Sequence, residues 1–260
     1  MKEIYRYISF ESFVDMIQRQ CLNFVHPTTW EDPQELLPYK LWLEDFQKKN
    51  PGKVFDILLH EIRMIKLYAQ CWTCIDESDA LWRIYSYNNF SIRISIDVED
   101  VYKLGNVYYH QVIYTDDFNN LSSRIEYDKI FCIKRNAFSH EQEVRLLYEH
   151  KFRDTDDFQY QAITMLMKHD VIQDEKLEWT HKFYDGKSLN EMKQDIEQRT
   201  TNLFYDKPTK DVSFAHISGF IKSVTLNPFA PKWFSTTVEQ FCMNNNISYL
   251  GQSKLYSEIH

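Results

Sequence analysis

The sequence predicts an α+β fold. Strand-like and helical patterns alternate along the chain, but they lack the regular strand–helix–strand rhythm that is typical of a doubly wound parallel sheet. No internal repeat is visible over the 260 residues, and the low counts of Gly (5) and Pro (7) argue against long linkers. We therefore expect a single domain over 1–260.

The N-terminal part is predicted to form a strand, a helix and a second strand. Ile4–Ile8 is apolar and strand-like, and Ser9 is placed to cap the helix that follows. Leu22–Val25 is the second predicted strand. The helix between them has an apolar face at helical spacing, formed by Phe10, Phe13, Val14 and Ile17.

A loop and two helices are predicted next. His26–Pro33 contains two prolines and polar turn formers that break any period. Helical patterns follow at 35–47 and 54–68, and Pro51 and Gly52 separate them.

The middle of the chain is predicted to be rich in strands. Gln70–Cys74 is expected to be a buried strand, and Ser78 or Asp79 is expected to cap a helix that carries Trp82 and Tyr85. Alternating or apolar patterns predict further strands at 90–96, 107–114 and 143–148.

The C-terminal part returns to an ordered pattern after a charged stretch. The segment 151–211 is weakly periodic and rich in helix formers, and we predict a helical insertion or a lid there. The elements expected after it are a strand at 218–226, a turn at Asn227 and Pro228, a helix capped by Ser235 that runs through Met243, and a closing strand at 247–250.

The charge balance restricts the partners. Thirty Lys and Arg residues against 38 Asp and Glu residues give a net charge of −8, which disfavours non-specific binding of nucleic acid through a broad basic face. A nucleic-acid substrate held in a local groove remains compatible with this charge.

Composition also indicates a cytoplasmic protein with no membrane partner. The N-terminus has no apolar signal core, and the longest apolar runs are too short to span a bilayer. The odd number of cysteines, five, does not form a disulfide framework. Cys71 and Cys74 lack the second pair that a zinc site needs, so we expect no metal.

Polar residues lie within strand-like segments that are far apart in the sequence. Arg6 is one, and a guanidinium suits the bidentate grip of a phosphate. Glu141 and Glu143 lie two apart, so on a strand they share one face, and Arg145 continues it. Two like charges side by side are costly unless the face is wet or a site uses them. We expect Glu143→Gln to leave the protein folded, because a carboxylate on such a face contributes little stability.

Each candidate also has an ordinary structural explanation. Arg6 could pair with one of many carboxylates, and the glutamates could form a solvated, salt-bridged face. Trp82 and Tyr85 lie three apart on one helical face, where aromatic residues often belong to a core. Asp32 and Glu35 could serve a helix N-terminus rather than the rim of a site.

Together these motifs resemble those of a widespread bacterial family of unknown function. Its members show a Tyr-[Arg/Lys]-Tyr start, Asp-Pro-x-Glu, Cys-[Trp/Phe]-[Ser/Thr], Trp-x-x-Tyr and Glu-x-Glu-x-Arg. The resemblance covers most of the first half of the chain and its C-terminal end. The matching segments are 5–7, 32–35, 71–73, 82–85, 141–145 and 224–228.

The chain also resembles ADP-ribosyltransferases, particularly toxins that modify DNA. Those begin with a Tyr-His-x-Thr strand, and Arg6 stands at the His position. Ala80–Ile84 is similar to their Met-Leu-Tyr-Arg-Ile, and Gln142–Leu146 is similar to their Ala-Glu-x-Leu-Val, with Glu143 as the catalytic glutamate. The chain departs from the pattern in having Arg145 on the last strand, and in lacking an obvious loop directed at DNA.

The second resemblance implies a fold and a reaction. The fold is a split, strongly bent β-sheet core, and the reaction transfers ADP-ribose from NAD to a macromolecule, nucleic acid or protein, with loss of nicotinamide. Glu143 would stabilise the oxocarbenium-like centre, and Glu141 would orient or deprotonate the acceptor. The residues implied to hold NAD are Arg6, Tyr7, Thr73, Trp82 and Tyr85, and those implied to contact the acceptor are Asp32, Glu35 and Arg145.

Such an enzyme would be toxic in a bacterial cytoplasm. The resemblance therefore implies a toxin–antitoxin or phage-defence effector with a neutralising protein partner. One alternative is a ribonuclease toxin, because Arg135 and His140 form the Arg-x4-His pattern of all-helical ribonucleases. That alternative requires a continuous helix over 135–146. Another alternative is a non-catalytic binding or sensor module that keeps the fold.

Overall fold

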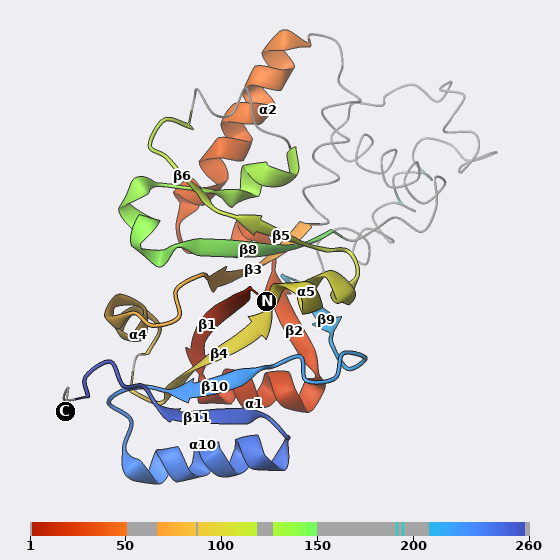
Figure 1. Ribbon diagram of the computed structural model, residues 1–260. Coiled ribbons are helices and arrows are strands. Elements are labelled where there is room, and N and C mark those ends of the chain that lie inside the picture. Colours follow the sequence, from red (N-terminus) through yellow and green to blue (C-terminus); the bar gives the residue numbers. More distant parts are fainter. Residues whose placement is uncertain are drawn as a thin grey trace.

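The computed structural model describes residues 2–50, 67–86, 88–118, 127–149 and 208–257, together with positions 191 and 194. Within these residues nine strands form one mixed sheet, and two further strands form a separate pair (Figure 1). Helices lie against and beside the large sheet. The predicted α+β class is confirmed.

One part of the sheet is built around β1 (Glu3–Ser9). β1 pairs antiparallel with β4 (Ser91–Asp97) along its whole length. β4 pairs in turn with β10 (Ser223–Leu226), and β11 (Ser248–Gln252) lies parallel to β10 at the edge. The alternating isoleucines of β4 are fully buried in the main hydrophobic core, as the sequence pattern predicts.

Two helices lie against this part of the sheet (Figure 1). They are α1 (Phe10–Arg19) and α10 (Lys232–Asn244). The rings of Phe10 and Phe241 join them, with centroids 5.5 Å apart. The predicted cap of α1 is confirmed, because the Ser9 side chain accepts a hydrogen bond from a backbone N–H of the first turn.

The sheet forks at β3 (Leu67–Thr73). One edge of β3 pairs with β8 (Glu143–Glu149) over its full length, and β5 (Val107–Gln111) follows on β8. The other edge pairs with β1 at one end and with β2 (Cys21–Val25) at the other end, through one residue pair each. β9 (Thr209–Ser213) extends the β2 branch. The β1 and β2 branches diverge from β3 (Figure 1).

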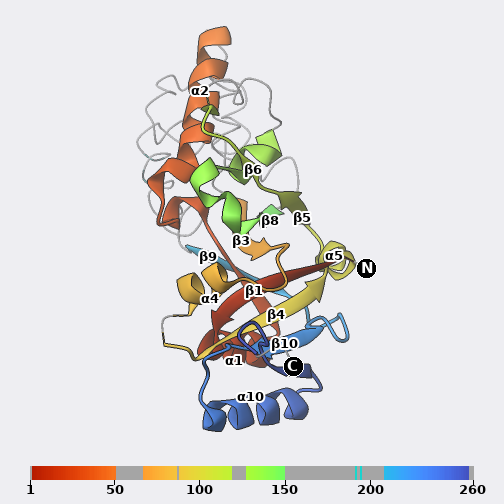
Figure 2. The ribbon, with the colours of Figure 1, turned by 60° about the vertical axis from the view of Figure 1, so that its left-hand side comes forward.

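The remaining elements frame the strands. Helix α4 (Asp79–Tyr85) lies against β1 (Figure 2), and Ser78 caps it. The short strands β6 (Ile113–Tyr114) and β7 (Ile133–Lys134) pair in parallel. The other described elements are α2 (Leu37–Lys49), α5 (Val98–Val101) and 3-10 turns at Pro27–Thr29, Pro33–Leu36, Tyr102–Leu104, Tyr127–Cys132 and Asn136–Glu141.

Two predicted helical segments end in strands instead. The helix predicted at 54–68 overlaps β3, because Leu67 and Tyr68 pair with β8; its part 54–66 lies outside the described residues. The insertion or lid predicted at 151–211 also lies outside them, apart from positions 191 and 194 and the segment 208–211. There Thr209–Asp211 pairs with β2, so the predicted C-terminal boundary of the insertion is wrong.

Helix α10 begins before its predicted cap. Pro231 precedes the helix, and the hydroxyl of Ser235 lies 3.0 Å from the hydroxyl of Tyr249. Three other predicted elements differ in their bounds. The predicted helix 35–47 is a 3-10 turn followed by α2, and the predicted strand 107–114 is divided into β5 and β6. The predicted strand 218–226 begins only at Ser223.

The helix that the Arg-x4-His alternative requires is not formed. Asn136–Glu141 is a 3-10 turn, and β8 follows it. Arg135 lies just before the turn and pairs with Asp32 at 2.8 Å. Arg135 and His140 therefore do not share the long helix of an all-helical ribonuclease.

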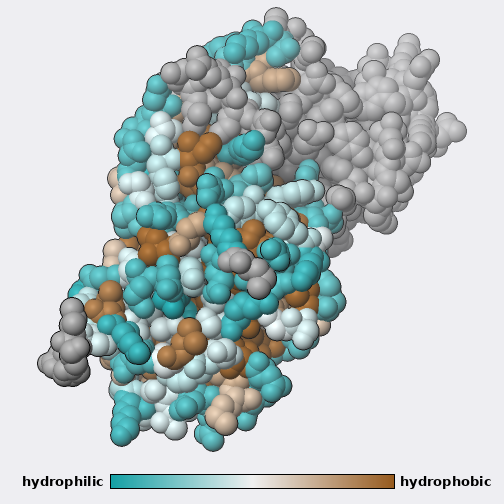
Figure 3. Space-filling model, viewed as in Figure 1, coloured by the Kyte–Doolittle hydropathy of each residue, from teal (hydrophilic) through white to brown (hydrophobic). Residues whose placement is uncertain are grey.

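The surface carries no broad apolar area on the face seen in Figure 3. Apolar residues there form separate small patches between polar ones. Among the described residues, no helix is both long enough and apolar enough to cross a membrane.

Candidate functional site

Strand register brings the candidate residues together. Tyr5 of β1 lies opposite Thr73 of β3, and Thr73 lies opposite Glu143 of β8. Three adjacent strands therefore carry Arg6, Thr73 and Glu143, although these residues are far apart in the sequence. Helix α4 adds Tyr85 from the side of β1.

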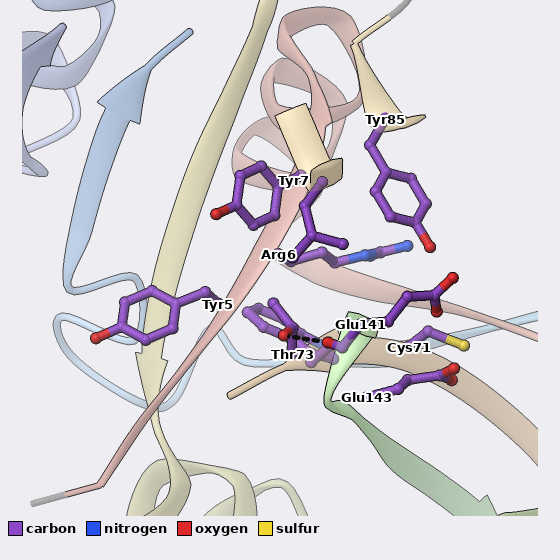
Figure 4. A pocket seen from close by; sticks show the side chains of 10 residues that line it. Tyr5, Arg6, Tyr7, Cys71, Thr73, Tyr85, Glu141 and Glu143 are labelled. Carbon is purple, nitrogen blue, oxygen red and sulfur yellow. Dashed lines mark hydrogen bonds between the residues drawn. The ribbon is translucent and has the colours of Figure 1, made fainter. Parts of the chain in front are cut away.

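A pocket with a cavity volume of about 120 Å³ lies where these strands meet (Figure 4). The structure thus brings to one cavity most of the residues that the sequence analysis assigned to catalysis and NAD binding. Its lining residues are Tyr5, Arg6, Tyr7, Cys71, Trp72, Thr73, Leu81, Tyr85, Glu141 and Glu143.

Arg6 brings a cation to the pocket. Its guanidinium extends toward the Tyr85 hydroxyl and the Glu141 carboxylate in Figure 4. Burial lowers the pKa of Arg6. No hydrogen bond or ion pair joins its guanidinium to any other described residue, so the ordinary pairing with a carboxylate does not occur within that part of the chain. An anionic ligand would supply the missing partner.

Glu143 is buried rather than placed on a wet face. Its side chain is 4 % exposed; Oε1 accepts a hydrogen bond from Arg145 Nε at 2.7 Å, and Oε2 accepts one from Lys134 Nζ at 2.8 Å. Burial alone would raise its pKa, but the charges of Arg145 and Lys134 and the Arg145 hydrogen bond lower it to about 2. The expectation for Glu143→Gln assumed a carboxylate on an open strand face, and the burial of Glu143 contradicts that assumption.

Glu141 reaches the pocket from a turn, not from the strand. It is the last residue of the 3-10 turn, and Gln142 after it has a left-handed backbone with φ of 41°. The Thr73 hydroxyl donates to the Glu141 carbonyl at 2.6 Å, as the dashed line in Figure 4 shows. The predicted shared strand face is thus wrong in detail, yet both glutamates line the same cavity.

Lys134 is the charged residue that the sequence analysis missed. It is the second residue of β7, and its Nζ lies 2.8 Å from Oε2 of both Glu141 and Glu143. Burial alone would lower the pKa of Lys134, but the two carboxylates raise it. The signal available in the sequence is a lysine at the end of the apolar run Ile130–Ile133.

The residues predicted to contact the acceptor make their contacts outside the pocket. Arg145 is fully buried, donates to Glu143 and to the Phe131 carbonyl, and pairs with Glu35. Asp32 accepts a hydrogen bond from the Gln34 backbone and pairs with Arg135. Arg145, Glu35 and Asp32 do not line the pocket. Arg145 therefore supports Glu143 directly and Glu35 does so through Arg145, whereas Asp32 pairs with Arg135 instead.

The predicted aromatic residues divide between core and pocket. Trp82 is 2 % exposed, packs edge-to-face on Tyr7 with centroids 4.7 Å apart, and does not line the pocket. Tyr7 lines the pocket, but its ring lies on the side of β1 away from Arg6 (Figure 4). Tyr85 directs its ring toward the Arg6 guanidinium, and burial raises the pKa of its hydroxyl.

The cysteine in the pocket is held as a thiol. Burial and the neighbouring Glu143 carboxylate raise the pKa of Cys71, which opposes a role as nucleophile. Among the described residues, no three His, Cys, Asp or Glu side chains are grouped so that they could hold a metal ion.

Comparisons with known proteins found no relative of this chain. No family model, no curated protein and no solved structure matches the chain. The resemblances to the two families therefore depend on the short motifs alone.

Proposed function

We propose that the protein is an NAD-dependent ADP-ribosyltransferase that acts on a macromolecule. One observation carries the proposal: the guanidinium of Arg6, which pairs with no other described residue, shares a small cavity with the ionised Glu143. The first group suits a phosphate of NAD, and the second suits the positive charge that develops when nicotinamide leaves.

The shape around Arg6 supports a dinucleotide. Arg6 lines the small pocket and also a second cavity of about 620 Å³, which lies over β1, α1 and β2 where the sheet forks. A cavity near 120 Å³ is of the size that holds one aromatic ring. A ligand with a ring at one end, phosphates at its centre and a second nucleoside beyond them would match this sequence of spaces. The forked sheet is also compatible with the split core that the resemblance implies.

The residues would divide the chemistry as follows. The bond between the ribose C1 atom and the nicotinamide nitrogen breaks, and the electron pair leaves with nicotinamide. The Glu143 carboxylate lies in the same cavity and would stabilise the positive charge on the ribose. The nucleophile of the acceptor forms the new bond to C1, and Glu141 would take its proton.

The test measures binding and turnover separately. Calorimetric titration with NAD gives the affinity, and release of nicotinamide gives the turnover. We expect Arg6→Ala to weaken NAD binding at least tenfold and Arg6→Lys to lose less. Arg83→Ala is the matched control, because Arg83 is exposed and paired with Asp79 on the outer surface of α4. Absence of NAD binding to the unaltered protein would remove the proposal.

One observation favours a second candidate, a binding module without turnover. Both oxygens of Glu143 already accept hydrogen bonds from Arg145 and Lys134, which leaves fewer of its lone pairs for a ribose hydroxyl. NAD binding without release of nicotinamide, in the presence of DNA, RNA and protein acceptors, would support that candidate. Growth arrest on expression in bacteria, relieved by Glu141→Gln, would support a toxin and therefore the enzyme.

A further inference from the structure

Lys134 has no part in the reaction proposed above, yet its ammonium group lies between the two glutamates that line the pocket. Its Nζ lies 2.8 Å from Oε2 of Glu141 and 2.8 Å from Oε2 of Glu143. The residue is 8 % exposed, and the two glutamates are 7 % and 4 % exposed. One ammonium group therefore bridges two carboxylates away from bulk water.

The distances limit how far apart the two carboxylates lie. Two oxygens that each lie 2.8 Å from one nitrogen are separated by at most twice that distance. Two buried carboxylates so close together normally share one proton, because the pKa of one of them is strongly raised. A cation between them removes the need for that proton.

The cations around the two glutamates are unequally distributed. Glu143 has a second cation, because Arg145 Nε donates to its Oε1 at 2.7 Å. Glu141 has no ion pair with any described residue other than Lys134. The further charged or titratable groups that face this trio in the described part of the chain are Arg6, Asp32, Glu35, Cys71, Tyr85 and Tyr114.

We propose that Lys134 is a positioning residue whose charge keeps Glu141 ionised beside Glu143, so that the pocket contains two carboxylates and no carboxylic acid. This inference stands on the ion pairs and does not require NAD to be the ligand. If the proposed reaction is right, it has a further consequence: a protonated Glu141 could not take the acceptor's proton. Lys134 would then also determine the lower pH limit of turnover.

The first test compares the unfolding temperatures of the unaltered protein and of Lys134→Met between pH 5 and pH 8. Without the cation, Glu141 should bind a proton in the folded state that it does not bind in the unfolded state. A pKa raised in the folded state adds stability that is lost as pH rises. The difference in unfolding temperature should therefore widen by about 3 °C per pH unit as pH increases, until pH exceeds the raised pKa.

A double variant separates this effect from simple loss of packing. Lys134→Met combined with Glu141→Gln lacks the second carboxylate. The difference in unfolding temperature between this double variant and the unaltered protein should therefore not vary between pH 5 and pH 8. Lys103→Met is the matched control, because Lys103 pairs at the surface with Asp100, which Lys222 also contacts. If the gap for Lys134→Met is constant with pH, or persists unchanged in the double variant, the proposal is overturned.

A direct measurement covers the case in which Lys134→Met does not fold. Carboxyl carbon shifts of 13C-labelled glutamate, assigned with Glu141→Gln, report the ionisation of Glu141 in the unaltered protein. We expect the ionised shift at pH 6, and the same shift in Lys134→Arg, which retains the charge. A Glu141 carboxyl that is protonated at pH 6 in the unaltered protein would overturn the proposal, whatever the result with NAD.

Discussion

At the scale of single residues, Glu143 shows what stabilises a buried carboxylate. A buried carboxylate is stable only when cations and hydrogen bonds replace the lost water. Lys134 and Arg145 do so here, and the two terminal nitrogens of Arg145 in turn donate to the Phe131 carbonyl and to Glu35. The two glutamates that line the pocket therefore belong to a buried network of ion pairs.

This network predicts a large cost for Glu143→Gln. Removing one member of a buried ion pair leaves uncompensated charge, so the free energy of unfolding should fall by about 3 kcal/mol at pH 7. Because the pKa of Glu143 is lowered to about 2, its contribution is present at neutral pH and is lost as pH falls below about 4.5. Urea unfolding of both proteins at pH 7, 5 and 4 measures this. A negligible difference at pH 7 would show that the ion pairs add no stability.

Replacement of Arg6 should have the opposite effect on stability to replacement of Glu143. Burial lowers its pKa and no described residue pairs with it, so the charge is unfavourable in the folded protein. Arg6→Ala should raise the unfolding temperature by about 2 °C while it weakens anion binding. Thermal unfolding with and without pyrophosphate measures both effects. A destabilised Arg6→Ala variant would indicate a structural role instead.

At the scale of elements, β3 organises the site because both of its edges are paired. β8 occupies one edge, and β1 and β2 divide the other, so residues of three strands face one cavity. Thr73 lies at the end of β3 where this occurs. Its hydroxyl donates to the Glu141 carbonyl and accepts from the Ile75 N–H at 3.0 Å, which joins β3 to the turn before β8.

Thr73→Val should loosen that turn. The change keeps the shape of the side chain and leaves two backbone groups without their partner, which costs about 2 kcal/mol when such groups are buried. Thr73→Ser retains the hydroxyl and should cost less. Thermal unfolding gives the stability, and hydrogen exchange at Ile75 reports the turn. Equal stabilities for the valine and serine variants would contradict this role.

At the scale of the whole molecule, charge limits how an acceptor can bind. The net charge is −8, and the face in Figure 3 shows polar residues with only small apolar patches. A nucleic-acid acceptor would therefore be held by a few local contacts. The proposed reaction needs only one acceptor group to reach the pocket, so weak binding is compatible with it.

We accordingly predict weak and salt-sensitive binding to DNA or RNA. Each phosphate contact contributes a slope of about −0.9 in the logarithm of affinity against the logarithm of salt concentration for duplex DNA. With about three such contacts, affinity should fall roughly fortyfold between 50 mM and 200 mM salt. Fluorescence anisotropy with a random duplex measures this. Tight binding at the higher salt concentration would contradict the prediction and would point to a basic groove.

Local patterns were sufficient for much of the fold. The cap at Ser9, the apolar face of α1 and the cap at Ser78 depend on neighbours in the sequence, and all three are confirmed. The strand predicted from the alternation at 90–96 is also present as β4, but its polar residues are buried together with its isoleucines. The motifs also placed Arg6, Tyr85 and Glu143 in one site, and all three line one cavity. The caps and the apolar patterns were predictable because periodicity and capping are short-range properties, whereas the shared site was implied by the resemblance of the motifs.

The tertiary structure alone decided which charged residues support one another. Lys134 lies in a two-residue strand with no periodic pattern, and β9 is recognisable only through its partner β2. The resemblance implied that Arg145 contacts an acceptor, whereas the fold buries it and pairs it with Glu143. Ion pairs and strand pairings between distant segments depend on burial and distance in three dimensions, and neither quantity is encoded in the spacing of residues along the chain.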